Sequence, residues 1–168
     1  MPQNLVRREA LHLNAAPPAS PEGAAAVREL LHLLDAQRSM AKEVLRRLDL
    51  SSNETQALRF LAQARREQRT VTAKELCTML NVTTATVTHV VDRLEALGDV
   101  ERVINPADRR ERVITATPAG VDKITAAYAR YHQHCADVFG ELAPAEAALL
   151  AETFAELAAR IEGTATRP

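Results

Sequence analysis

The chain has 168 residues, 46% of them hydrophobic, and its 21 basic and 22 acidic side chains leave a formal net charge of −1. That length is enough for one domain with a real core. No apolar run approaches the length of a membrane span, and residues 1–20 lack the continuous apolar core of a signal peptide. We therefore expect a cytoplasmic protein without a membrane partner, in which both cysteines stay reduced.

Alanine and leucine dominate the composition, which favours a mainly helical protein. Residues 1–21 are expected to form a flexible N-terminal arm, within which residues 4–13 can form a short helix. Ser20-Pro21-Glu22 is typical of a helix start. The long helix that follows has one apolar side, formed by Val27, Leu30, Leu31, Leu34, Ala41, Val44, Leu45 and Leu48.

Three shorter helices are expected next. Ser51-Ser52-Asn53-Glu54 caps the first of them, whose core face holds Leu58, Leu61 and Ala62. Thr72-Ala73-Lys74-Glu75 fits a capping box and opens a helix that ends near Asn81. Its apolar side carries Leu76, Cys77 and Leu80. Thr83 or Thr84 then caps the third helix, which ends at Gly98 and has an apolar stripe of Val87, Val90, Val91, Leu94 and Leu97.

The polar face of this third helix carries mostly short side chains: Thr84, Ala85, Thr88, His89 and Asp92, with Thr86 at the edge. Short side chains at a helix N-terminus can approach base edges in a DNA major groove. The alternative is a surface helix whose polar face meets only water. The helix and turn before it and the hairpin after it favour a recognition helix.

A basic hairpin is expected after the recognition helix. Residues 100–104 and 113–117 are β-rich runs, and Asn105-Pro106-Ala107-Asp108 is a turn signal between them. Arginines gather in and beside the hairpin, at positions 102, 109, 110 and 112. An arginine at a hairpin tip can enter a narrow minor groove, and a nearby carboxylate can hold it extended. An ordinary solvated hairpin is the alternative. Thr117-Pro118 then restarts a helix.

Two C-terminal helices carry apolar stripes at spacings of three and four. The stripes consist of Val121, Ile124, Tyr128, Tyr131, Cys135 and Val138, and of Leu150, Phe154, Leu157 and Ile161. A winged helix of about 70 residues cannot cover these helices and the first long helix from one subunit, so a second copy is their natural partner. The fold class predicted is mainly α with a small β-hairpin wing, a winged helix-turn-helix with N- and C-terminal dimerisation helices. Residues 51–117 form the DNA-binding lobe, and residues 22–50 and 118–163 form the helical dimerisation region.

Three sequence motifs are typical of a known protein family. They are Leu94-Glu95-Ala96-Leu97-Gly98-Asp99-Val100, Asp108-Arg109-Arg110 and Ile114-Thr115-Ala116-Thr117-Pro118-Ala119-Gly120. Together they resemble the MarR family of bacterial transcription regulators, and a looser similarity runs from about Ala24 to Ile161. The resemblance implies an obligate homodimer that binds a palindromic operator in double-stranded DNA and releases it when a small ligand binds. His89 stands at a position where many members have Arg or Lys. The base contact made there, and with it the operator sequence, therefore does not follow from the resemblance.

The site residues follow from these arguments. The expected DNA contacts are Thr84, Ala85, Thr86, Thr88, His89, Arg93, Asp108, Arg109, Arg110 and Arg112. The family resemblance implies an effector crevice between the dimerisation helices and the DNA-binding lobe. A small anionic or aromatic effector would meet His32, Arg38 and Arg59 there, since arginine suits an anion. The alternative is that these three are ordinary surface residues.

Catalysis, cofactors and metals are not expected. The chain has no Gly-rich phosphate loop, nucleophile motif or HExxH-type site. His132 and His134 point about 200° apart on a helix, so they cannot share one ion without help. The leading hypothesis is a dimeric repressor relieved by a ligand. One alternative senses oxidants through Cys77 or Cys135, and another is a helical module that binds protein instead of DNA.

Overall fold

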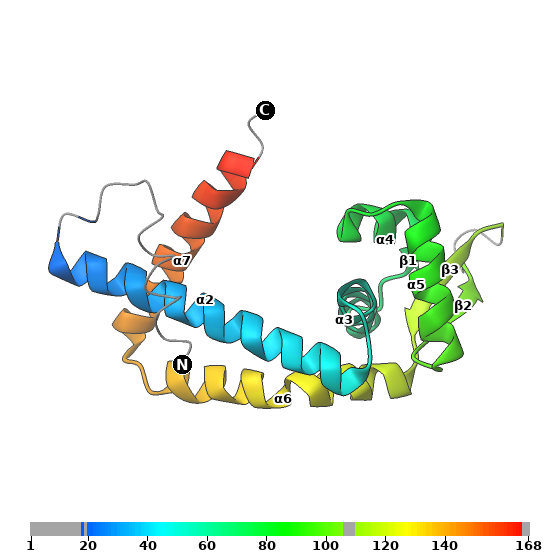
Figure 1. Ribbon diagram of the computed structural model, residues 1–168, viewed down its shortest axis with the longest axis horizontal. Helices are drawn as coiled ribbons and strands as arrows, with labels where there is room; N and C mark the ends of the chain where they lie inside the picture. The colour runs from blue at the N-terminus through cyan, green and yellow to red at the C-terminus, as the bar shows by residue number, and fades with distance from the viewer. Residues whose placement is uncertain (1–17, 19, 106–109, 166–168) are drawn as a thin grey trace. The chain divides into compact units, whose positions relative to one another are not determined.

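A computed structural model describes residue 18 and residues 20–105 and 110–165. The expected helix at residues 4–13 and the hairpin tip at residues 106–109 lie outside the described residues. The fold is mainly helical with a small antiparallel sheet, as predicted (Figure 1). The elements are α2 (Pro21–Leu48), α3 (Ser52–Arg66), β1 (Val71–Thr72), α4 (Ala73–Leu80), α5 (Thr84–Ala96), β2 (Val100–Ile104), β3 (Arg112–Ala116), α6 (Pro118–Gly140) and α7 (Pro144–Ala165).

The chain divides into two compact units, Met1–Ile124 and Thr125–Pro168. The boundary falls inside α6, so the first two turns of this helix belong to the first unit. The division into a DNA-binding lobe and a dimerisation region, drawn at residues 51–117, remains a prediction. None of the described helices is long and apolar enough to cross a membrane.

The first helices begin where the sequence predicts. The Ser20 hydroxyl accepts a hydrogen bond from the amide of Gly23 (3.0 Å), and Pro21 follows at the favoured first position of α2. Ser51 and Glu54 form a reciprocal capping box at the start of α3. Asp49 ends α2 in the left-handed conformation, with φ of 53°. Local capping chemistry therefore sets these boundaries.

The sheet has three strands in the order β1-β3-β2, all antiparallel. β2 and β3 form the expected hairpin, with Val100 opposite Ala116 and Ile104 opposite Arg112. β3 ends at Ala116, one residue before the predicted end, because the Thr117 hydroxyl instead accepts from the amide of Gly120 (3.0 Å) at the start of α6. The sequence did not predict β1, whose two residues are too short to show an alternating pattern.

The core of the first unit lies between α3, α4, α5 and the sheet. The predicted apolar faces of these three helices are confirmed, and the buried residues include Leu58, Leu61, Leu76, Val87, Val91 and Leu94. One expectation was wrong. Leu97 is 39% exposed, because it caps the C-terminus of α5 and the chain turns away there. Cys77 of α4 is half-buried.

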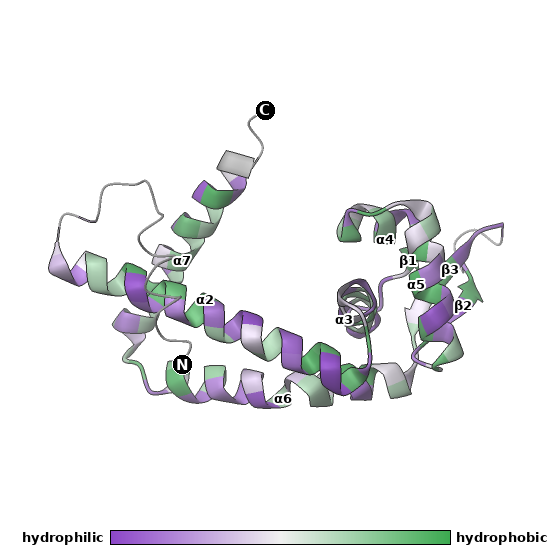
Figure 2. Ribbon diagram, in the orientation of Figure 1, coloured by the Kyte–Doolittle hydropathy of each residue, from purple (hydrophilic) through white to green (hydrophobic). Residues whose placement is uncertain are grey.

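The long helices keep much of their apolar surface exposed. Figure 2 shows hydrophobic residues recurring along α2, α6 and α7. In α2 only Val44 is buried, whereas Val27 and Leu34 are exposed. Val138 in α6 and Phe154 in α7 are exposed as well. One chain leaves these stripes largely uncovered.

The start of α6 is packed onto the link between α5 and β2. A Cβ atom added at Gly120 would lie 2.9 Å from the carbonyl carbon of Asp99 and 3.0 Å from its Cα. The Thr117 amide donates to the Asp99 carbonyl (2.9 Å), and the Thr117 hydroxyl donates to the Gly98 carbonyl (2.7 Å). The buried Asp99 carboxylate pairs with Lys123 of α6 (2.6 Å). Only glycine at position 120 permits this approach.

Gly120→Ala is expected to lower the free energy of unfolding by about 1–3 kcal/mol, because the new methyl group meets backbone that cannot rotate away. Gly140→Ala, at the last residue of the same helix, is the matched control, since no atom lies within 4 Å of its added Cβ. Urea denaturation followed by circular dichroism measures both. Equal stability of the two variants would contradict the close approach.

Candidate nucleic-acid interface

The helix-turn-helix consists of α4, a short turn and α5. The Thr72 amide donates to the Glu75 carboxylate (2.7 Å), and the Glu75 amide donates to the Thr72 hydroxyl (3.2 Å). The hydrogen bond from the Thr72 backbone is the main reason that the pKa of Glu75 is lowered. α4 ends at Asn81, whose φ of 52° is left-handed as predicted. Both ends of α4 are thus fixed by residues within four positions.

Thr83 caps α5, which decides between the two threonines that the sequence offered. Its hydroxyl accepts from the amide of Thr86 (3.3 Å) and shares a second hydrogen bond with the Thr86 hydroxyl (3.0 Å). Thr86 is half-buried as a result. Thr84 becomes the first residue of α5, with an exposed side chain.

The N-terminal half of α5 presents an exposed face of short side chains, formed by Thr84, Ala85, Thr88 and His89. We call these four residues the recognition face. The Thr88 hydroxyl donates to the Thr84 carbonyl (3.0 Å), which leaves its oxygen as an acceptor. The opposite side of the helix is held in the core by Val87, Val90, Val91 and Leu94. Exposed polar groups on a rigid, buried support suit the reading of base edges.

Arg93 lies on the same helix but reaches toward α2. Its guanidinium is 3.8 Å from the carboxylate of Asp49, and both side chains are well exposed. An exposed pair at this distance contributes little free energy, so Arg93 can exchange this partner for a phosphate. Asp92 does not pair with its neighbour Arg93. It bonds instead to Arg102 of β2.

The hairpin brings Arg110 and Arg112 to the surface, and both side chains are exposed. At the loop end of the hairpin, the backbone amide of Asn105 donates to the Glu111 carbonyl (2.9 Å), and the Asn105 side chain donates to the Glu111 carboxylate (2.8 Å). Asp108 and Arg109 lie outside the described residues.

Arg102 was expected among the basic residues of the wing, but it is engaged within the protein. Its guanidinium bonds to Asp92 (2.5 Å) and to Glu95, both on α5. Burial lowers the pKa of Arg102, but the hydrogen bonds and charges of the two carboxylates outweigh this, and the pKa is raised overall. Sequence spacing could not identify this pairing, because it joins a strand to a helix.

The three residues proposed for an effector are exposed. His32 lies 3.7 Å from Glu29, and Arg38 pairs with Asp35 at 3.2 Å, each within α2. Six residues separate His32 from Arg38, about 240° around the helix, so they occupy different faces. Arg59 is exposed on α3.

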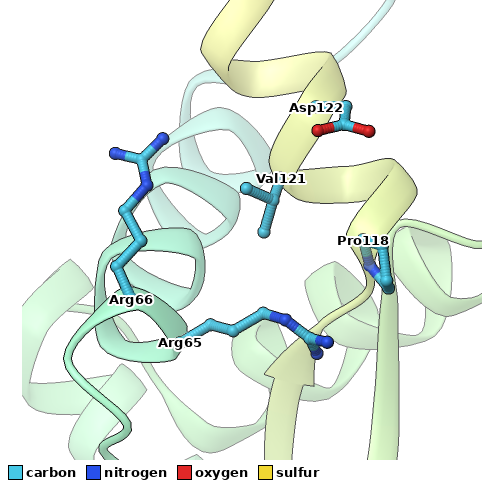
Figure 3. Close-up of a pocket in the computed structure, with 5 residues that line it drawn as sticks. All are labelled: Arg65, Arg66, Pro118, Val121 and Asp122. Atoms are coloured by element: carbon cyan, nitrogen blue, oxygen red, sulfur yellow. The ribbon is translucent and has the colours of Figure 1, made fainter.

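A pocket of about 330 Å³ lies elsewhere in the first unit, between the end of α3 and the start of α6 (Figure 3). It is lined by Arg65, Arg66, Pro118, Val121 and Asp122. Arg65 donates to the Ala116 carbonyl (2.7 Å), and Val121 points from α6 toward the space between the two arginines. Sequence reasoning missed the pocket because residues 65 and 118 are far apart in the chain.

No group of three or more metal-binding side chains occurs among the residues that the structure describes. His132 stacks on Tyr128 with ring centroids 6.2 Å apart, which gives this histidine a structural neighbour. Both cysteines are half-buried free thiols. The Cys77 sulfur lies 3.8 Å from the Thr84 hydroxyl, and Cys135 lies in α6.

The capped helix pair, the antiparallel hairpin and the third strand define a winged helix-turn-helix protein. Residues 48–111 match the model of the MarR family. YdcH of Bacillus subtilis (strain 168), described as an uncharacterized HTH-type transcriptional regulator, is 41% identical over 58 residues, which make up 34% of this chain and 40% of that relative. The match therefore spans less than half of the relative's length. The family model thus matches the helix-turn-helix and the first strand of the hairpin, and the match covers less than half of this chain.

Solved structures share the fold over a longer stretch. The MepR Q18P mutant from a multidrug resistant S. aureus clinical isolate has a TM-score of 0.63 at 17% identity, and covers 79% of this chain and 95% of its own. An S. aureus MepR–DNA complex has a TM-score of 0.58 at 16% identity, with 77% and 95% covered. S. aureus MepR bound to ethidium bromide has a TM-score of 0.58 at 18% identity, with 79% and 94% covered. At these identities the likeness establishes the fold.

Adjacent threonines provide a test of how α5 is held. Thr83→Ala is expected to lower the free energy of unfolding by about 1 kcal/mol, because it removes the N-cap. Thr84→Ala makes the same chemical change one residue later on an exposed side chain, and should stay within about 0.5 kcal/mol of the native chain. Thermal and urea denaturation measure both. A larger loss for Thr84→Ala than for Thr83→Ala would show that the cap is assigned to the wrong residue.

Proposed function

We propose that this chain is a sequence-specific DNA-binding transcription regulator that acts as a homodimer and is a repressor relieved by a small ligand. One observation carries the proposal. The recognition face is exposed on a helix whose other side is locked in the core, and an arginine-bearing hairpin follows that helix. A helix of this kind fits a major groove while a basic hairpin meets the backbone or the minor groove beside it.

Each residue has a distinct role in the proposal. Thr84 and His89 contact base edges, and Ala85 packs against a thymine methyl. The Thr88 hydroxyl donates to a phosphate oxygen, which replaces its hydrogen bond to the Thr84 carbonyl. Thr86 lies at the edge of the face and chiefly supports the cap. Arg93 and the wing residues Arg109, Arg110 and Arg112 meet the DNA backbone or minor groove, with Asp108 orienting an arginine.

A dimer is proposed because the exposed stripes of α2, α6 and α7 need a cover. Val27 and Leu34 in α2, Val138 in α6, and Phe154 and Ile161 in α7 are all exposed. A symmetric pair would cover these stripes and would place two recognition helices about one DNA turn apart, as a palindromic operator requires.

The pocket at the end of α3 is the proposed effector site. Its arginines suit a carboxylate, and Val121 and Pro118 supply apolar contact for a small ring. The pocket also adjoins the first turn of α6, which is packed against the end of α5 through Gly120 and Asp99. A ligand that shifts this turn would therefore change the position of the recognition helix, α5.

His89→Ala is expected to change the operator preference at one position and to cost roughly 1–3 kcal/mol of binding there. The experiment selects DNA fragments with the native chain and with the variant, and then measures affinity on the native operator. His134→Ala, an exposed histidine of α6, is the matched control and should behave as native. If the native chain selects no DNA, the alternative of a protein-binding module replaces the proposal.

The native chain is expected to show twice its chain mass in light scattering at micromolar concentration, with an interface of about 2,000 Å² or more. Phe154→Glu should favour the monomer by placing a charge on the apolar stripe of α7. Ala155→Glu, on the adjacent exposed position, is the control and should remain dimeric. A monomeric native chain would refute the dimer.

Benzoate is expected to raise the melting temperature of the protein and to weaken its binding to the selected operator, whereas neutral benzamide should do neither. Arg66→Gln should abolish the benzoate effect, and Arg28→Gln on exposed α2 should preserve it. Equal responses to benzoate and benzamide would remove the assignment of an anionic ligand. An oxidant response that thiol alkylation blocks would instead favour sensing through Cys77 or Cys135.

A further inference from the structure

Two carboxylates lie on the helix that is proposed to enter the DNA groove. Asp92 and Glu95 are three residues apart, so they share one face of α5, and their side chains are 58% and 41% exposed. Asp92 follows His89 by three residues, about 4.5 Å along the helix axis. That distance is well inside the screening length of roughly 8 Å at physiological salt. Unpaired carboxylates here would repel the phosphates that flank the groove.

One arginine from the neighbouring strand meets both carboxylates. The Arg102 guanidinium donates through Nη2 to Asp92 Oδ1 (2.5 Å) and through Nη1 to Glu95 Oε2. The Arg102 backbone amide also donates to Glu95 Oε1 (3.4 Å). The forked shape of a guanidinium suits it to hold two acceptors one helical turn apart.

Arg102 differs from the other arginines of the wing in its surroundings. It lies in the middle of β2, opposite Ile114 of β3, and its side chain is only 26% exposed. Arg110 and Arg112 are exposed nearer the tip of the same hairpin. The Arg102 side chain therefore points across to α5, and its charge is opposed by two carboxylates.

We propose that Arg102 is a positioning residue of the DNA-binding surface, which offsets one of the two negative charges of Asp92 and Glu95 and anchors strand β2 to α5 without contacting DNA itself. This inference rests on the proposed DNA-binding function. It explains how a helix that carries two acidic residues beside its recognition face can approach a polyanion. It also assigns the phosphate contacts of the wing to the arginines nearer its tip.

The decisive variant is the triple change Arg102→Gln with Asp92→Asn and Glu95→Gln, which keeps hydrogen-bonding side chains at all three positions and removes all three charges. Arg102→Gln alone should weaken binding to the selected operator about tenfold or more, because it leaves two like charges facing the phosphates. The triple variant should bind at least as tightly as the native chain. A direct phosphate contact by Arg102 requires the opposite, a triple variant that is still about tenfold weaker than native.

A control separates local neutralisation from net charge. Arg102→Gln combined with Glu152→Gln and Glu156→Gln changes the net charge equally, but the two glutamates lie on α7. This variant should stay as weak as Arg102→Gln. Restored binding here would overturn the proposal, because the effect would then come from overall charge.

Folding and function are distinguished within the same experiment. Circular dichroism and melting temperature report whether each variant is folded. If Arg102→Gln unfolds, the comparison of the folded triple variant with the native chain still decides the question. If the native chain selects no DNA, the proposed function fails, whereas a native chain that binds and a triple variant that does not would overturn only the role of Arg102.

Discussion

The close contact between Gly120 and the backbone of Asp99 is the constraint on which the first unit depends. It fixes three element ends at once, since α5 ends just before Asp99, β2 begins just after it, and α6 starts against it. Thr117 and Lys123 reinforce the contact with hydrogen bonds to the carbonyl and carboxylate of Asp99. A backbone-to-backbone contact tolerates little displacement, so the recognition helix and the wing are held in one geometry.

Helix α6 extends from the contact between Gly120 and Asp99. The helix begins at the contact and continues through the boundary between the two compact units. The first turn of α6 contacts the link that follows α5, and the pocket lined by Arg65 and Val121 adjoins that same turn.

The charged side chains of the lobe are paired locally, which makes a near-neutral chain compatible with the polyanionic partner that we propose. Arg102 is committed to Asp92 and Glu95, and Arg69 lies over the ring of Phe60 and near Glu75. These arginines support the structure. The exposed arginines of the hairpin remain at the surface beside the recognition face. A formal net charge of −1 thus says little about the potential at one face of the molecule.

The sequence by itself determined the helix caps and the left-handed turn at Asn81, because each depends on residues within about four positions. It also determined the apolar stripes of α3 to α5 and the hairpin, because these follow from the local periodicity of the chain. The choice of Thr83 over Thr84, the exposure of Leu97, the strand β1, and the partners of Arg93 and Arg102 were decided only by the tertiary structure. The recognition face was predictable as what remains when an apolar stripe is buried. The pairing of Arg102 with α5 and the pocket at Arg65 were not, since packing alone brings residues distant in sequence within bonding distance.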